Sequence, residues 1–424
     1  MVNKTLADAC EIIMGQSPAG EMCNTSGVGL PLLNGPTEYG AHHPTPVQFT
    51  TDPRKRAKKG DLLFCVRGST TGRMNWADRD YAIGRGVAAI RHKSHHKLQP
   101  LVRAVVEYNL PFLLIQATGS TFPNVSSGLL SNLPWPEHEE NQLLAISHIL
   151  GTLDDKIEIN RKQNETLETM IRTLFKAWFL DFEPVRAKQE GRWQRGQSLP
   201  GLPAHLYDLF PERLVESESG EIPEGAEITS LSAYSSLNPE SWTKRTRPEQ
   251  IRYVDLSNTK WGRIESVTHY EADDAPSRAQ RVLRPLDTIV GTVRPGNGSY
   301  ALISDEGLTG STGFAVLRPL EREYFAFVYL AATSRENIER LSNLADGGAY
   351  PAVRPDAVSS TQVMRAGHEL INAFSRQVNP MLSGMADNDR TSQSLTQLRN
   401  TLLPKLISGD LHIPDAERIL GASI

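Results

Sequence analysis

Two long stretches of the chain carry apolar residues spaced three and four positions apart, the pattern of a helix that packs along one seam. They run from about residue 139 to 181 and from about residue 367 to 407. Forty helical residues span about 60 Å, so a coiled-coil pair is favoured over two amphipathic helices that each pack on their own domain. The seam positions are Leu150, Leu153, Ile157, Asn160, Asn164, Leu167, Ile171, Leu174 and Trp178 in the first stretch, and Val378, Met381, Met385, Asn388, Ser392, Leu395, Leu402 and Leu406 in the second.

Polar and helix-breaking residues modify both seams. Asn160 opposite a polar partner would fix the register of the helices at some cost in stability. Pro380 has no amide for the backbone ladder, so we expect a kink or a break near it. Arg399 also interrupts the apolar pattern, and the second helix is therefore expected to be the weaker one.

Before each long helix, short strand-like runs and small-residue loops follow the same order, displaced by about 227 residues. The matches pair Asp61 with Asp287, Arg67 with Arg294 and Gly86 with Gly313. Chance similarity between Gly- and Pro-rich loops is the alternative, but three matches in one order argue against it. The matches are GDLLFCVRGS (60–69) with LDTIVGTVRPG (286–296), IGRGVAAIR (83–91) with GSTGFAVLR (310–318), and GSTFPNV (119–125) with GGAYPAV (347–353), the last carrying Phe122-Pro123 and Tyr350-Pro351.

The repeat and the helices together predict an α/β (α+β) chain with two similar domains. A connector rich in Gly, Pro and charge follows the first helix, and Leu206, Leu209 and Phe210 suggest that a short helix in it docks on a neighbouring part. We expect the first α/β domain at 1–138, the first long helix at 139–182, a linker at 183–222, the second α/β domain at 223–366, and the second helix with a C-terminal tail at 367–424.

Composition adds constraints and one difficulty. The 424 residues, 39% hydrophobic and 22% charged, suit a globular protein with at least two cores. No apolar run approaches the length of a membrane span and the start lacks a signal-peptide layout, so we expect a cytoplasmic location. Cys10, Cys23 and Cys65 indicate neither a disulfide framework nor a zinc site. The formal net charge of −4 gives no global electrostatic case for nucleic acid.

Motifs for catalysis are missing from the sequence. We find no Gly-rich cofactor loop after a strand, no Asn- or Asp-Pro-Pro-aromatic motif for gripping a flipped base, and no GxxxxGK[ST] phosphate loop. The carboxylates at 154–158 fit a solvated helix face better than a nuclease site. The histidine pairs at 42–43 and 95–96 lack a third metal ligand. We therefore predict no catalytic residues and no metal site.

Several strings in the connector and near the C-terminus are similar to those of a known family. Because these strings occur in the same order as in that family, the chain resembles, along essentially its whole length, the specificity subunit of type I restriction-modification systems. The strings are FEPVRAK (182–188), LPGLP (199–203), LYDLFP (206–211), SESGEIPEG (217–225) and LLPKLISGDL (402–411).

The resemblance implies two target recognition domains that each read one half of a split DNA sequence. Two antiparallel helices would hold them apart as a ruler and would give the chain approximate two-fold symmetry. The helices would also dock two modification subunits, which are S-adenosylmethionine-dependent adenine methyltransferases, while restriction-motor subunits join the larger assembly. The chain itself would hold no cofactor; S-adenosylmethionine, ATP and Mg are expected on the partner subunits.

Basic residues beside small ones are the candidates for contact with double-stranded DNA, because arginine can grip guanine bidentately and small residues permit close approach to phosphate. The alternative is that Arg67 and Arg294 close salt bridges at strand ends. The run at 243–247 fits an exposed loop better than a DNA clamp. The candidates are Arg67, Ser69, Thr70, Thr71, Arg73 and Arg85 in the first copy, and Arg294, Asn297, Ser299, Tyr300, Ser311 and Thr312 in the second.

Partner subunits would meet the helical seam and its aromatic end. Trp178, with Phe175 and Phe179 nearby, is either a core residue or an anchor for a partner, and core packing is slightly favoured. A coiled-coil adaptor that reads no DNA and a self-sufficient DNA-modifying enzyme are the rival functions. The candidate partner-binding residues are Leu153, Ile157, Leu174, Trp178, Leu402 and Leu406.

Overall fold

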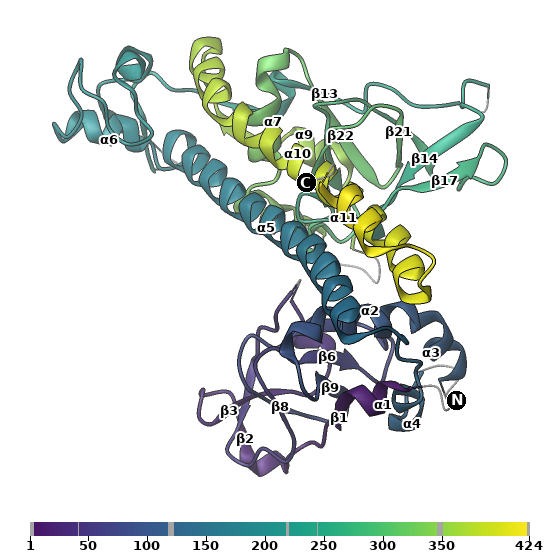
Figure 1. The fold of residues 1–424 in the computed structure, drawn as a ribbon. Helices are drawn as coiled ribbons and strands as arrows, with labels where there is room; N and C mark the ends of the chain where they lie inside the picture. Colours follow the sequence, from purple (N-terminus) through teal and green to yellow (C-terminus); the bar gives the residue numbers. More distant parts are fainter. Residues whose placement is uncertain are drawn as a thin grey trace. The chain divides into compact units, whose positions relative to one another are not determined.

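The computed structural model describes residues 4–40, 42–117, 123–217, 220–243, 245–345 and 351–421. The chain divides into two compact units: unit 1 comprises Met1–Lys162 and Asn388–Ile424, and unit 2 comprises Gln163–Asp387. Two long helices, α5 (Glu140–Phe179) and α10 (His368–Ser408), contribute residues to both units (Figure 1). Phe122, Tyr350 and Lys244, which belong to the sequence matches and the basic run, lie outside the described residues.

Unit 1 has two sheets, and one of them is covered by helices. In its four-stranded antiparallel sheet, Leu62 and Phe64 pack with apolar residues of helix α2, whereas Leu63 and Cys65 pack toward the second sheet. Successive side chains of a strand point to opposite faces, which is why a continuous apolar run forms the middle of these layers. The strands and helices are α1 (Leu6–Ala9), β1 (Cys10–Met14), β2 (Cys23–Asn24), β3 (Leu30–Leu33), β4 (Gln48–Thr50), β5 (Arg56–Ala57), β6 (Leu62–Cys65), β7 (Met74–Trp76), β8 (Tyr81–Ile83), β9 (Val87–His92), α2 (Gln99–Tyr108), α3 (Leu110–Gln116) and α4 (Ser127–Ser131).

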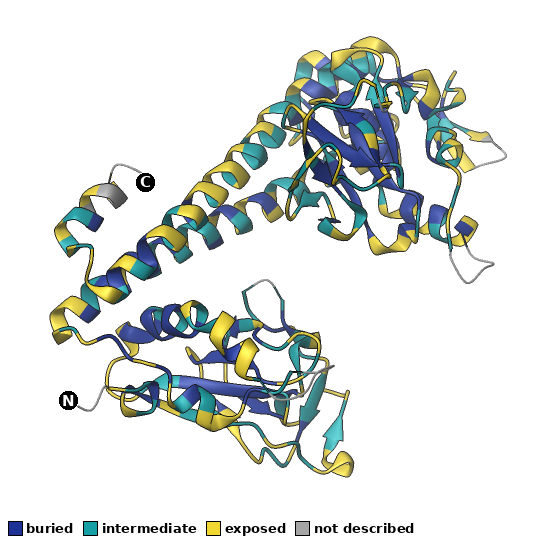
Figure 2. Ribbon diagram, turned by 90° about the vertical axis from the view of Figure 1, so that its right-hand side faces the viewer, coloured by how far each residue is buried: buried dark blue, intermediate teal, exposed yellow. Residues whose placement is uncertain are grey.

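Unit 2 is layered in the same way. Val290 and Leu317 pack with the entirely buried helix α7, and Ile289 and Val316 pack toward the second sheet. Figure 2 shows buried strands of this unit in dark blue. The strands and helices are α6 (Glu183–Gln189), β10 (Leu214–Ser217), β11 (Gly220–Pro223), β12 (Ile228–Ser230), β13 (Ser235–Leu237), β14 (Gln250–Val254), β15 (Thr259–Lys260), β16 (Arg263–Ile264), β17 (Thr268–Glu271), β18 (Ala279–Leu283), β19 (Thr288–Gly291), β20 (Tyr300–Leu302), β21 (Leu308–Ser311), β22 (Phe314–Pro319), α7 (Phe325–Ala332), α8 (Arg335–Ala345), α9 (Pro355–Ser359) and β23 (Gln362–Met364).

The two units repeat one strand topology. The sheet order β1-β9-β6-β7 in unit 1 corresponds to β13-β22-β19-β20 in unit 2, and β4-β3-β8-β5 corresponds to β17-β14-β21-β18. In each second sheet the corresponding pair is parallel, β3 with β8 and β14 with β21. The predicted internal repeat and the α/β fold class are confirmed.

The strand register corrects one detail of the predicted repeat. Leu62 pairs with Ile90 as Thr288 pairs with Leu317, so positions along β6 and β19 differ by 226 residues. Counting on from these pairs, Arg67 corresponds to Val293 and not to Arg294. Arg67 and Val293 each form the isolated β-bridge that follows their strand. The sequence match was wrong by one residue here because an arginine stands next to a small-residue turn in both copies.

A buried ion pair is duplicated with the repeat. The guanidinium of Arg91 on β9 donates to both carboxylate oxygens of Asp61, at 2.6 Å each, and Asp61 is 1% exposed. In unit 2, Arg318 donates to both oxygens of Asp287 at 2.9 and 2.8 Å, and Asp287 is fully buried. Each carboxylate also accepts the backbone amide three residues before it. The predicted Asp61–Asp287 correspondence therefore marks a structural pair that ties two neighbouring strands together.

Polar side chains interrupt the seam of the helical pair in each unit. In unit 1, the amide of Asn160 donates to the carbonyl of Asn388 at 3.4 Å and to the Ser392 hydroxyl at 3.2 Å. In unit 2, the amide of Asn164 donates to the carbonyl of Met385 at 3.1 Å. Ascending positions on α5 meet descending positions on α10, as an antiparallel pair requires. The polar partner predicted for Asn160 is present.

The expected weak points of the second helix are accommodated. Helix α10 runs through Pro380 without a break. Pro380 is exposed, so its ring and the carbonyl left without a donor lie on the solvent side. Arg399 is nearly buried and donates to Asp154 at 2.7 Å and to Glu107 at 2.8 Å within unit 1. Its charge is neutralised by two carboxylates, which explains how a cation stands beside an apolar seam.

The connector after α5 is folded onto unit 2. Trp193, Leu206 and Phe210 are buried in the same cluster as the end of α5, which confirms that this segment docks. Lys188 of α6 is buried, donates to the carbonyl of Phe210 at 2.7 Å, and lies 3.8 Å from the ring centre of Tyr207. A last helix, α11 (Ile413–Gly421), follows α10.

Candidate nucleic-acid interface

The loop after β6 presents exposed polar side chains on unit 1. Arg67, Ser69 and Thr70 are exposed, and the Thr71 hydroxyl lies 2.7 Å from the carbonyl of Gly68 and 2.8 Å from that of Pro123. Gly68 has a φ of +102°, which favours glycine. Arg67 makes one long contact, 3.4 Å from Nε to an oxygen of the Asn124 side chain. The Thr71 hydroxyl thus anchors the loop to backbone carbonyls, while the side chains of Arg67, Ser69 and Thr70 face solvent.

Two further arginines of unit 1 have different roles. Arg73 donates to the carbonyl of Tyr39 at 2.9 Å and lies 3.4 Å from that of Pro36, so it fastens one loop to another. Arg85 is exposed, and its backbone amide contacts the Ser17 hydroxyl at 3.3 Å. Arg85 is therefore available to a ligand, whereas Arg73 is held largely by the chain itself.

The corresponding loop of unit 2 is a single tight turn. Arg294 and Asn297 are exposed at its ends, and Arg294 has a φ of +47°. The Asn297 amide donates to the Arg294 carbonyl at 2.9 Å and closes the turn. Neither Arg67 nor Arg294 forms a salt bridge with any residue that the structure describes. Within the described ranges, then, neither arginine closes the strand-end salt bridge that was the alternative.

Three predicted contact residues of unit 2 are buried. The hydroxyl of Ser299 donates to the Leu256 carbonyl at 3.0 Å, and the Ser311 hydroxyl accepts the Gly313 amide at 3.2 Å. The Tyr300 hydroxyl accepts from Arg172 of α5 at 3.2 Å, and burial raises the pKa of this phenol. The side chains of Ser299, Tyr300 and Ser311 thus serve the packing of unit 2 and are not accessible to a ligand.

Sequence reasoning missed two exposed residues beside these loops. The half-buried Thr312 donates its amide to the carbonyl of Arg278, whose side chain is exposed. Arg278 follows a serine and precedes an alanine, so the rule that selected Arg67 would have selected it too. Trp261 is 56% exposed and lies beside the Arg294 turn. Arg247 of the basic run instead donates to the Ala279 carbonyl at 2.7 Å.

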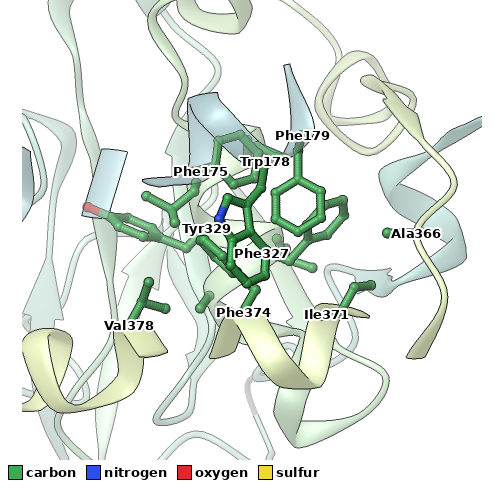
Figure 3. Packing of buried hydrophobic residues seen from close by; sticks show 14 of the residues in the cluster. Phe175, Trp178, Phe179, Phe327, Tyr329, Ala366, Ile371, Phe374 and Val378 are labelled. Carbon is green, nitrogen blue, oxygen red and sulfur yellow. The ribbon is translucent and has the colours of Figure 1, made fainter. Parts of the chain in front are cut away.

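The predicted partner-binding residues are interior to the chain's own packing. Trp178 is 3% exposed and stacks with Phe179, Phe210 and Phe374, as the close view in Figure 3 shows for the labelled rings. The core alternative for Trp178 therefore holds. Leu153, Leu402 and Leu406 are buried in the core of unit 1, and Ile157 and Leu174 are partly buried against the cores of units 1 and 2. A partner would have to meet other faces of these helices.

Histidines and carboxylates among the described residues are potential ligands for a metal ion. Across the described ranges, no group of three or more His, Cys, Asp or Glu side chains is placed to hold a metal ion. Burial lowers the pKa of His42 to about 4, although Glu158 at 3.7 Å opposes the shift. The imidazole is thus neutral at pH 7, and the contact is no ion pair there. His95 contacts Glu140 at 2.7 Å.

The carboxylates of α5 only partly follow the prediction of a solvated face. Asp155 is exposed, but Glu158 is buried and accepts two bonds from Arg161, at 2.7 and 2.6 Å. Asp154 is held by Arg399.

None of the described helices is both long and apolar enough to cross a membrane.

Comparison with known proteins gives a consistent picture. The family model described as "Type I restriction modification DNA specificity domain" matches residues 1–169. The HindI type I restriction enzyme specificity subunit of Haemophilus influenzae is 24% identical over 408 residues, covering 84% of this chain and 88% of that protein. A putative specificity subunit, MjaX, of Methanocaldococcus jannaschii is 35% identical over 160 residues, 37% of each chain.

A solved structure shares the fold. The S subunit of a type I restriction-modification system from M. genitalium superposes with a TM-score of 0.54 at 16% identity, covering 96% of this chain and 95% of that one. The likeness thus extends over both units and both long helices, while the family model matches the N-terminal segment of unit 1 and most of α5. The chain is therefore similar, over most of its length, to the specificity subunits of type I restriction-modification systems.

Proposed function

We propose that this chain is the DNA-reading subunit of a type I restriction-modification complex and that it recognises a split target. The observation that carries the proposal is the duplicated domain with an exposed arginine turn after the corresponding strand, at Arg67 in unit 1 and Arg294 in unit 2. Two similar modules suit two half-sites on one duplex. Each would read one half.

The contacts follow from the chemistry of the exposed side chains. An arginine can donate two parallel bonds to the major-groove edge of guanine, and small hydroxyl residues can approach phosphate closely. In unit 1 these are Arg67, Ser69, Thr70 and Arg85, with Thr71 beneath them. In unit 2 they are Arg294, Asn297 and Thr312, together with Arg278.

The net charge of the chain suggests that other subunits neutralise part of the DNA phosphate charge. At −4 the chain cannot supply broad phosphate neutralisation, which gives non-specific DNA affinity. Two modification subunits would supply much of it and would flip and methylate the target adenine with S-adenosylmethionine. Restriction-motor subunits would use ATP and Mg. We propose that this chain is non-catalytic, carries no cofactor and acts in the cytoplasm.

The outer faces of the long helices are the proposed docking surface for modification subunits. The seam side chains are already buried by the chain itself. On α5, however, Ile159 of unit 1 is 49% exposed and Met170 of unit 2 is 46% exposed. Exposed apolar side chains on a helix are suited to a protein partner. Glutamate at either position should weaken co-purification with the modification subunit without changing the melting temperature.

The test is to express the chain with its modification subunit and to map methylated adenines across a host genome by long-read sequencing. A two-part motif with a fixed unread spacer is the expected result. No new methylation despite a stable complex would contradict the proposal and favour an adaptor that reads no DNA. Methyl transfer by the isolated chain would contradict its non-catalytic role.

Single arginine variants then assign the halves. Arg67→Ala should relax or abolish one half of the motif, and Arg294→Ala the other. Arg79→Ala and Arg335→Ala are matched controls, since both arginines are exposed and each pairs with a neighbour on its own segment. An unchanged motif in both test variants would remove these turns from the DNA interface.

A further inference from the structure

Trp261 stands at the tip of the β15–β16 hairpin of unit 2 with 56% of its surface exposed. The other five tryptophans are buried or half-buried. Leaving so large an aromatic surface in water forgoes the stabilisation that burial gives. A single exposed tryptophan of this kind needs a reason outside the packing of the unit.

The backbone holds this tryptophan in a sparsely populated conformation. Its φ is +49°, in the left-handed region that disfavours side chains with a Cβ. Two bonds fix it there: the Trp261 amide donates to the Gly298 carbonyl at 2.7 Å, and the Gly262 amide donates to the Tyr300 carbonyl at 2.9 Å. The hairpin is thereby fastened to strand β20 and to the end of the Arg294 turn.

The indole ring is also held in place. A Cβ added to Gly298 would lie 2.6 Å from two ring carbons of Trp261, so the ring rests directly on the glycine backbone. Tyr300 packs against the ring edge-on, with centroids 6.0 Å apart. One part of the ring is therefore supported while the rest faces solvent. A side chain prepared in this way loses little rotamer freedom on binding.

The charges around the ring favour an anionic ligand. Lys260 precedes it and Arg263 follows Gly262, and the exposed Arg294 and Asn297 belong to the adjacent turn. The carboxylate of Glu168, which lies near the hairpin, is engaged by Arg172 at 3.0 Å. Two further acids flank the hairpin: Asp255, which accepts from the Tyr253 hydroxyl at 2.9 Å, and Glu265. An aromatic ring among basic residues is suited to contact the sugars and phosphates of a nucleic-acid backbone.

We propose that Trp261 contacts the DNA half-site read by unit 2, with its indole stacking on a deoxyribose of the backbone beside the Arg294 turn. The inference rests on the proposed function and adds a residue that the arginine pattern does not predict. Unit 1 differs at this place. There the segment bonded to β7 carries Tyr39, which is 4% exposed. The stacking contact is thus specific to one half-site.

The experiment uses the complex of the full chain with its modification subunits and a duplex bearing the mapped target. Trp261→Ala should weaken binding about ten-fold, the change produced by the loss of about 1.4 kcal/mol of contact free energy. Trp261→Phe should retain most of the affinity. Leu320→Ala is the control, since Leu320 is 58% exposed in the same unit, and it should change affinity less than about two-fold.

Duplexes with one scrambled half-site locate the contact. The loss of affinity caused by Trp261→Ala should persist when the half-site read by unit 1 is scrambled. It should disappear when the half-site read by unit 2 is scrambled. If Trp261→Ala binds the target as tightly as the wild-type complex, and the wild-type complex still prefers the target over a scrambled duplex, the inference about Trp261 is overturned and the proposed function stands. A wild-type complex with no preference overturns the proposed function instead. Loss of the modification subunit from Trp261→Ala, with DNA binding intact, assigns the ring to a protein contact and also overturns the inference.

A folding defect in the alanine variant does not prevent the test. In wild type, target DNA should protect one indole from acrylamide quenching, and this protected fraction should be missing from Trp261→Phe. Equal quenching of the wild-type complex with and without DNA contradicts the stacking contact.

Discussion

Replacing Arg91 with methionine should destabilise unit 1 by removing the counter-charge of a buried carboxylate. Asp61 is 1% exposed, and in the variant its carboxylate would keep the Lys58 amide, at 2.7 Å, as its one partner among the described residues. Breaking a buried pair from one side costs about 3–5 kcal/mol, because the remaining charge is left without compensation. That is a large share of the roughly 5–15 kcal/mol that stabilises an ordinary domain.

The same reasoning predicts that a second substitution relieves the first. In the double variant Asp61→Leu/Arg91→Met both charges are gone, and apolar replacements of buried ion pairs are often neutral. The double variant should therefore be more stable than Arg91→Met alone. Arg79→Met, which breaks the exposed pair with Asp78, should cost less than about 1 kcal/mol.

The measurement is urea denaturation combined with hydrogen exchange followed by mass spectrometry. Peptides from β6 and β9 should lose protection in Arg91→Met, while those from β19 and β22 of unit 2 should not. Arg318→Met should give the reverse pattern. An Arg91→Met variant as stable as wild type, or a double variant less stable than the single one, would refute the account of the buried pair.

Three further predictions concern the helical pair and its surroundings. Asn160→Leu should raise the melting temperature but loosen helix register, seen as a less uniform spacer in the methylated motif; a lower melting temperature would contradict the cost assigned to the buried amide. In the folded chain the pKa of His42 is about 4, against 6.5 for the free group. Between these pH values the unfolded chain binds one more proton at this residue than the folded chain does. The free energy of unfolding should therefore fall as the pH drops from 6.5 toward 4. His42→Gln should flatten that part of a pH series of urea midpoints, and an unchanged slope would show that other groups cause it. Trp178→Ala should cost about 3–5 kcal/mol by opening the aromatic cluster of unit 2; a fully stable variant that merely loses its methyltransferase would restore the partner interpretation.

Periodic and repeated features of the structure were readable from the sequence. The seam of α5 was predictable because each turn places the same kind of side chain on one face, and the displaced strand motifs revealed the duplication. Contacts between distant positions were not readable. Nothing near Arg399 in the sequence indicates that Glu107 and Asp154 neutralise it.

The candidate site was predictable as loops but less so as individual side chains. Arg67 and Arg294 follow buried strands and are exposed, as expected. Tyr300 was mistaken for a surface residue because it follows a polar turn, yet it lies on β20, a short strand of the sheet, and Arg172 of α5 donates to its hydroxyl. Exposure in such short strands depends on what packs above them, and local sequence does not contain that information.

The buried pair that ties β6 to β9 also bears on how such a chain can diversify. Asp61 and Arg91 are separated by 30 residues, and their counterparts Asp287 and Arg318 by 31, so each pair is encoded within one short stretch of gene. A genetic exchange that replaces one recognition domain would carry both members of its pair together. The incoming domain would arrive with its internal charges already balanced, and a new DNA preference could be acquired without a compensating mutation elsewhere.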